Sequence, residues 1–170
     1  MNPFVERMIR AAKLDVSLYE EVEADKTATL QSMMVIILSS VATGIGAARA
    51  GGIALLSGII AALIGWLIWS YLIYIIGTKI LPTRHTYADF GELLRTIGFA
   101  SSPGLIRILG IIPGLAWISA TAASIWMFIT MIIAVRQALD YRSTARAFGV
   151  CAIGGIVYIV TLSIFYSLIN

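Results

Sequence analysis

Charge is scarce in this chain. Only 12% of its 170 residues are charged, whereas a soluble domain of similar length carries about twice that share. Hydrophobic residues make up 59% of the sequence, and the mean hydropathy is +0.93. Long uncharged stretches alternate with short charged clusters. These features exclude an ordinary soluble domain and indicate an integral membrane protein.

Residues that support enzyme and metal chemistry are also few. The single cysteine, Cys151, excludes an intrachain disulfide and a cysteine-pair metal site. The single histidine, His85, follows Arg84 in a charged loop, where a solvated side chain is expected. The sequence contains no phosphate-binding glycine loop, HExxH motif or GxSxG motif. We therefore expect no catalysis, cofactor or metal, and no nucleic-acid partner, because the basic residues follow membrane topology.

Five apolar segments approach the roughly twenty residues needed to cross a bilayer. The predicted spans are residues 30–48, 53–76, 90–109, 115–135 and 148–169. The third contains charges and a proline, so a re-entrant path with four spans is the alternative. If the chain crosses the membrane five times, ten of the 12 lysines and arginines lie on the same side of the membrane as the N-terminus, and only Arg49 and Arg107 lie on the other side. Loops rich in lysine and arginine stay in the cytoplasm.

The predicted fold is therefore all-α: a multi-pass integral membrane bundle of five transmembrane helices. The N-terminus is expected in the cytoplasm and the C-terminus outside. Residues 1–29 form a cytoplasmic leader, and residues 30–170 form the transmembrane domain.

The leader is predicted to begin with an amphipathic helix. Asn2 can cap it, and Pro3 suits its first turn. Apolar and basic side chains occupy opposite arcs, which favours binding to anionic lipids of the cytoplasmic leaflet. Packing against the bundle is the alternative. The expected lipid-surface arm comprises Phe4, Arg7, Met8, Ile9, Arg10 and Lys13. The acidic segment 20–25 is expected to contact the basic cytoplasmic connectors.

The third span raises the question of how a membrane helix accommodates its polar residues. Pro103 predicts a bend near residues 101–104, with neighbouring serine hydroxyls bonding to the freed carbonyls. Arg95 is expected to pair with Glu92 or Asp89, and Arg107 to reach the outer headgroups. Alternatively, one arginine faces a polar cavity, as intramembrane charges often do.

Small residues recur every four positions within the predicted spans, as in Ser40-Gly44-Ala48 and Ser57-Ala61-Gly65. Such stripes allow helix backbones to approach closely in lipid. Packing within one chain is the simpler interpretation, and self-association is the alternative.

Several segments resemble the Yip1 family. They are Gly77-Thr78, LLRTIGFASSP at 93–103, Trp126, AVRQAL at 134–139 and the leader sequence LDVSLYEEVEAD. The resemblance covers about residues 10–165, and its most specific part is the G-F-A-x-x-P block. It implies five transmembrane helices with a cytosolic N-terminus and, for the prokaryotic type, residence in the plasma membrane. Eukaryotic relatives bind prenylated Rab GTPases, but their D-L-Y-G-P-like leader motif is absent here, which disfavours a GTPase adaptor.

The expected function is that of a non-catalytic membrane protein which organises, or assembles with, other membrane proteins or lipids, whether alone or as a subunit of a larger complex. The alternative is a small-solute or ion transporter or channel that uses the Pro103 break and Arg95 or Arg107. The candidate functional or structural residues are Glu92, Arg95, Gly98, Phe99, Pro103, Arg107 and Arg136.

Overall fold

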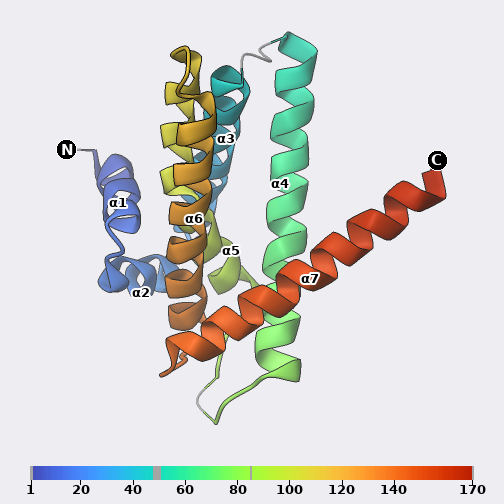
Figure 1. Cartoon of the computed structure of the whole chain (residues 1–170). Helices are drawn as coiled ribbons and strands as arrows, with labels where there is room; N and C mark the ends of the chain where they lie inside the picture. The colour runs from blue at the N-terminus through green and yellow to red at the C-terminus, as the bar shows by residue number, and fades with distance from the viewer. Residues whose placement is uncertain (1, 48–50, 85, 170) are drawn as a thin grey trace.

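The computed structural model describes residues 2–47, 51–84 and 86–169, and every regular element in these ranges is a helix (Figure 1). Two short helices, α1 (Pro3–Ala12) and α2 (Val16–Ala24), precede α3 (Ala28–Gly46) and α4 (Gly52–Ile75). A π-helical turn, η1 (Ile76–Ile80), extends α4. The chain continues through α5 (Phe90–Ala100), the 3₁₀ helix η2 (Ser102–Ile111), α6 (Ala116–Ala138) and α7 (Thr144–Ile169). Ala48, Arg49 and His85, named above, lie outside the described residues.

Four helical segments in the described ranges are long and apolar enough to cross a membrane. They are Ala28–Gly46, Gly52–Ile80, Ala116–Ala138 and Thr144–Thr161, and they coincide with four of the five predicted spans. The predicted span 90–109 is instead two consecutive short helices, α5 with 11 residues and η2 with 10. The described part of the chain is thus all-helical and contains four candidate membrane spans.

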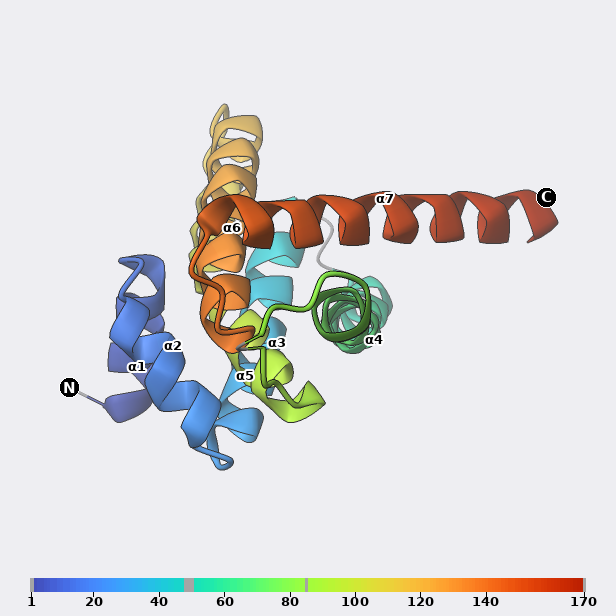
Figure 2. The ribbon, with the colours of Figure 1, turned by 90° about the horizontal axis from the view of Figure 1, so that it is seen from below.

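The long helices alternate in direction (Figure 1). In that view α3 rises, α4 descends, α5 and η2 rise together, α6 descends and α7 rises obliquely. The views in Figures 1 and 2 both show α1 and α2 on the flank of the bundle opposite α4, and α7 extending away from the other helices towards its C-terminal end.

Helix α5 forms the centre of the bundle. Eight consecutive residues, Leu93 to Ala100, are buried, because α2, α3, α4 and α6 all pack against it. Leu18, Tyr19 and Val22 of α2 have no exposed surface and share a hydrophobic cluster with Phe99. The leader therefore packs into the bundle, which is the alternative arrangement considered for it above.

Helix α3 approaches α5 and η2 through small residues. A Cβ atom placed on Gly98 would lie 2.4 Å from the Ser32 side chain, and one on Gly46 would lie 1.8 Å from the Arg107 carbonyl oxygen. The contact positions recur every seven residues on α3, at Ser32, Ser39 and Gly46, and every six along α5 and η2, at Gly98, Gly104 and Gly110. These spacings are about two turns of an α-helix and two turns of a 3₁₀ helix, respectively.

Candidate functional site

The junction between α5 and η2 is the structural counterpart of the predicted bend. Helix α5 ends at Ala100, and the 3₁₀ helix begins at Ser102, so the regular helix breaks where Pro103 predicts it. Because Pro103 has no backbone N–H, the Phe99 carbonyl lacks its usual donor. The Ser102 hydroxyl donates to this carbonyl at 2.7 Å, and the Ser101 hydroxyl donates to the Ile97 carbonyl at 3.3 Å. The two serines therefore bond to freed carbonyls, as predicted.

The remaining residues of the G-F-A block connect three other helices to this junction. Gly98 provides the close contact with α3, and Phe99 packs against α2. The Ala100 carbonyl accepts a hydrogen bond from the buried Thr130 hydroxyl of α6 at 2.6 Å. The block from Gly98 to Pro103 is thus a structural junction.

Arg95 has partners other than the predicted ones. Its Nε donates to the carbonyl oxygens of Val22 and Glu23 at 2.9 and 3.2 Å, and its terminal Nη2 donates to Glu23 as well. Within the described ranges Arg95 forms no ion pair, so the predicted pairing with Glu92 or Asp89 is wrong. Glu92 and Asp89 instead form a capping box at the start of α5, with bonds of 2.7 and 2.8 Å. Asp89 and Glu92 thereby satisfy backbone donors of α5.

Arg95 provides hydrogen-bond donors for carbonyl groups at the C-terminal end of α2. The last four carbonyls of a helix have no intrahelical partner, and a guanidinium both bonds to them and interacts favourably with the negative end of the helix dipole. The Arg95 side chain is only 5% exposed. Arg95 is therefore a buried clamp that joins the leader to the central helix.

Three acidic residues of the leader, Asp15, Glu21 and Asp25, pair with arginines of α1. Arg7 pairs with Glu21 at 2.8 Å and with Asp25 at 2.9 Å, while Arg10 pairs with Asp15 at 2.8 Å and with Glu21 at 2.6 Å. The hydrogen bonds from Arg10 and Ser17 lower the pKa of Asp15 to about 2. The acidic segment was predicted to contact the basic connectors; among the described residues Glu20 does so, by accepting a hydrogen bond from the Gln137 side chain at 2.9 Å.

The apolar arc of α1 is divided between two environments. Phe4 and Met8 pack against the cluster formed by α2 and α5, whereas Val5 and Ile9 are exposed. Asn2 caps the helix by accepting from the Phe4 N–H at 2.9 Å, as predicted. At the other end the Trp126 indole N–H donates to the Ala12 carbonyl at 2.8 Å. Lys13 is exposed.

Arg136 stabilises the connector between α6 and α7. Its guanidinium donates to the Tyr141 carbonyl at 3.2 Å and to the Thr144 hydroxyl at 3.3 Å. The Tyr141 hydroxyl in turn lies 3.0 Å from the Gly77 carbonyl and 2.7 Å from that of Leu81. Arg136 thus helps to hold the end of α6 beside the end of α4.

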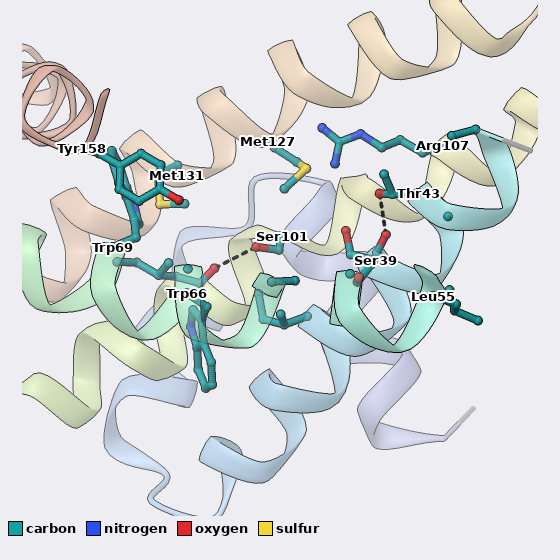
Figure 3. Close-up of a pocket in the computed structure, with 18 of the residues that line it drawn as sticks. Ser39, Thr43, Leu55, Trp66, Trp69, Ser101, Arg107, Met127, Met131 and Tyr158 are labelled. Carbon is teal, nitrogen blue, oxygen red and sulfur yellow. Dashed lines mark hydrogen bonds between the residues drawn. The ribbon is translucent and has the colours of Figure 1, made fainter. Parts of the chain in front are cut away.

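Arg107 lies at one end of a groove of about 670 Å³ (Figure 3). Ser39 and Thr43 lie at the same end, and Trp69 and Tyr158 lie at the other. The Arg107 guanidinium donates to the Ser124 hydroxyl of α6 at 3.0 Å. Arg107 is the only charged residue among the described residues that line this groove.

The groove exists because α4 stands apart from α6. Helix α4 packs against α3 and α5 but makes almost no contact with α6. The floor is formed by α3, α5 and the junction between α5 and η2, and includes Ile36 of α3, Ile97 of α5 and the junction residue Ser101. Helices α4 and α6 form the sides, and Tyr158 of α7 contributes at one end. No sequence pattern predicts this groove, although the alternative that one arginine faces a polar cavity follows from the sequence.

The groove offers binding groups but no acid–base pair. Its described lining contains hydroxyls, aromatic rings, methionine sulfur and one guanidinium, but no carboxylate or histidine. Across the described residues no cluster of three or more His, Cys, Asp or Glu could hold a metal ion. In the described part of the chain, Nε1 of Trp69, which lines the groove, and Oγ of Ser70, which does not, are buried without a hydrogen-bond partner. Such a lining suits an amphipathic molecule with an anionic group.

The fold and this lining define a multi-pass integral membrane protein with apolar helices around a divided central helix. The Yip1 domain family model matches residues 23–164, which is most of the chain. The chain therefore belongs to the Yip1 family. Comparisons with curated proteins and with solved structures return no match.

Proposed function

We propose that this Yip1 family protein is non-catalytic and assembles with other membrane proteins or lipids. The observation that carries this proposal is that the polar residues at 95–102 bond to the chain itself. Arg95, Ser101 and Ser102 all bond to backbone carbonyls of the chain itself. Their role is thus to join helices, which leaves apolar helix faces and the Arg107 groove as the surfaces available to partners.

We further propose that the chain crosses the membrane five times with its N-terminus in the cytoplasm. Helix α5 with 11 residues and η2 with 10 would together span about 37 Å at the rises of α and 3₁₀ helices, which exceeds the roughly 30 Å of the hydrocarbon core. The placement of lysines and arginines supports the same topology.

The leader is proposed to touch lipid through a narrower surface than the sequence predicts. Val5 and Ile9 are exposed on α1, and Lys13 is exposed after it. Arg7 and Arg10 are paired with leader carboxylates, so they add little attraction to anionic lipid. Apolar contact by Val5 and Ile9 is therefore the main proposed interaction.

Assembly is tested by chemical cross-linking of the intact chain in native membranes, followed by its molecular mass in a mild detergent. Discrete cross-linked species that survive purification are expected. A protein that stays monomeric both in membranes and in detergent would contradict assembly with other proteins.

Transport of a small anion is the second candidate function, favoured by the position of Arg107 in the groove. It is distinguished by flux of anions into vesicles that contain the purified chain. Anion flux that disappears in Arg107→Leu would favour the transporter. Flux equal to that of protein-free vesicles would favour the first proposal, a protein that assembles with other membrane proteins or lipids.

A further inference from the structure

The groove beside α4 combines one guanidinium with a mainly apolar lining. We propose that it binds one anionic phospholipid, with the lipid phosphate at Arg107 and an acyl chain along the groove towards Trp69. The proposal deepens the proposed function, since it names the lipid, and it rests on that function for the location of the site in a bilayer. It does not depend on whether the chain assembles with other proteins.

Arg107 is a cation that leaves most of its hydrogen-bond donors unused among the described residues. A guanidinium has five N–H donors, yet among the described residues Arg107 makes a single side-chain hydrogen bond, to Ser124, and no ion pair. It is partly buried in an otherwise uncharged groove. A cation there is costly without an anionic partner. A phosphate accepts two parallel bonds from a guanidinium, and this geometry suits Arg107.

The position of Arg107 is fixed before any ligand binds. The backbone around Arg107 packs directly against Gly46 of α3, where there is no room for a side chain. The arginine side chain therefore extends from a rigid point, and a bound anion does not have to order a loop. Ser40 also lines the groove, and its hydroxyl has no hydrogen-bond partner among the described residues, so it can donate to phosphate or ester oxygens.

The remainder of the groove suits a hydrocarbon chain. It continues from Arg107 past Met127 and Met131 to the rings of Trp69 and Tyr158 (Figure 3). Its volume of about 670 Å³ falls within the roughly 300–1,000 Å³ typical of small-molecule sites. Because α4 and α6 make almost no contact with each other, a chain can enter sideways from the bilayer. An anion held at one end and an apolar path at the other match a phospholipid better than free phosphate.

Charge complementarity further selects an anionic headgroup. The described lining has no carboxylate to neutralise a choline or ethanolamine cation. Phosphatidylglycerol, which carries a phosphodiester and no cation, is therefore the appropriate probe.

The test uses the full chain in mixed micelles with phosphatidylglycerol, and native mass spectrometry measures the lipid retained per protein. One retained lipid is expected. Arg107→Leu should reduce retention about tenfold, which corresponds to the loss of charge-assisted hydrogen bonds, and Arg107→Lys should restore part of it. A Cβ on Gly65 would meet only the Tyr158 hydroxyl, at 3.7 Å, so Gly65→Leu should fold and block the apolar part of the groove. It should lower retention without changing charge.

Arg84→Leu is the matched control, because Arg84 is an exposed arginine outside the groove. It should retain lipid as the unmodified chain does. Equal retention by Arg107→Leu, or an equal loss in Arg84→Leu, would overturn the site. Release of the lipid by millimolar inorganic phosphate would show a free-anion site instead and would overturn the phospholipid assignment. A monomeric chain that retains lipid would contradict protein assembly but not this inference.

Discussion

The segment formed by α5 and η2 has an arginine near each end, and the two arginines have different surroundings. At the α5 end Arg95 is 5% exposed and bonds to carbonyls at the end of α2. At the η2 end Arg107 has one hydroxyl partner and faces a groove. A charged residue in an apolar helix can therefore serve either the fold or a ligand, and its partners distinguish the two roles.

The largest effect is expected where the backbones of α3 and η2 touch. In Gly46→Ala the new methyl group would lie 1.8 Å from the Arg107 carbonyl oxygen, and backbone cannot move aside as a flexible side chain can. We expect a destabilisation of about 3 kcal/mol or more, measured as a lower melting temperature in a fixed detergent. Gly149→Ala is the control, because nothing lies within 4 Å of its Cβ position. Equal melting temperatures for the two variants would refute the close contact.

The next effect compares the two arginines directly. Arg95→Leu leaves the Val22 and Glu23 carbonyls without their donor and should cost about 1–3 kcal/mol. It should also increase hydrogen exchange in residues 16–24. Arg107→Leu, studied in detergent without added phospholipid, should leave the melting temperature unchanged or raise it, because it removes a partly buried cation that has no anionic partner among the described residues. If the two variants are equally destabilised, the contrast between a structural and a ligand-facing arginine is lost.

The junction between the two ends should show an intermediate effect. Thr130→Val removes the buried hydroxyl that bonds to the Ala100 carbonyl at 2.6 Å, and we expect a loss of about 1 kcal/mol. Thr161→Val is a suitable control, because Thr161 of α7 is exposed and its hydroxyl bonds only within its own helix. Melting temperatures of both variants, recorded in the same detergent, test whether the cross-helix bond matters.

A smaller effect, on the pH dependence of stability, is expected at Glu23, whose carbonyl binds Arg95 at the α5 end. Burial raises the pKa of Glu23 to about 7, and the neighbouring carboxylates of Glu92 and Asp140 shift it in the same direction. The folded protein thus binds this proton more tightly than the unfolded chain. The associated stability is present at acidic pH and declines as the pH rises from about 4.5 towards 7.

Glu23→Gln should make the melting temperature less dependent on pH across this window. A pH profile that is identical to that of the unmodified chain would exclude Glu23 as the titrating group. Because the side chain is partly exposed, the effect should be modest.

Local rules predict much of this structure. The four candidate spans follow from apolar length, the Asn2 cap from helix-end chemistry, and the break before Pro103 from its missing N–H. Each depends on residues near one another in the chain, so the sequence alone carries enough information.

Other features depend on contacts between distant segments. The carbonyls that bind Arg95 are 72 and 73 residues away, and sequence spacing instead favours the nearby Glu92. The ten-residue length of η2 is unusual, because 3₁₀ helices seldom exceed a few residues; it accompanies the glycine contacts with α3. The groove likewise depends on the separation of α4 from α6, which no local pattern encodes.

The central claim is that α5 and η2 together cross the membrane once. Its most direct test uses two single-cysteine variants in a Cys151→Ser background, Tyr87→Cys and Ile111→Cys, at residues that are 81% and 64% exposed. Intact cells and inverted membrane vesicles are treated with a membrane-impermeant maleimide. We predict that Ile111→Cys is labelled only from outside and Tyr87→Cys only from the cytoplasmic side. Labelling of both positions from the same side would contradict the single crossing.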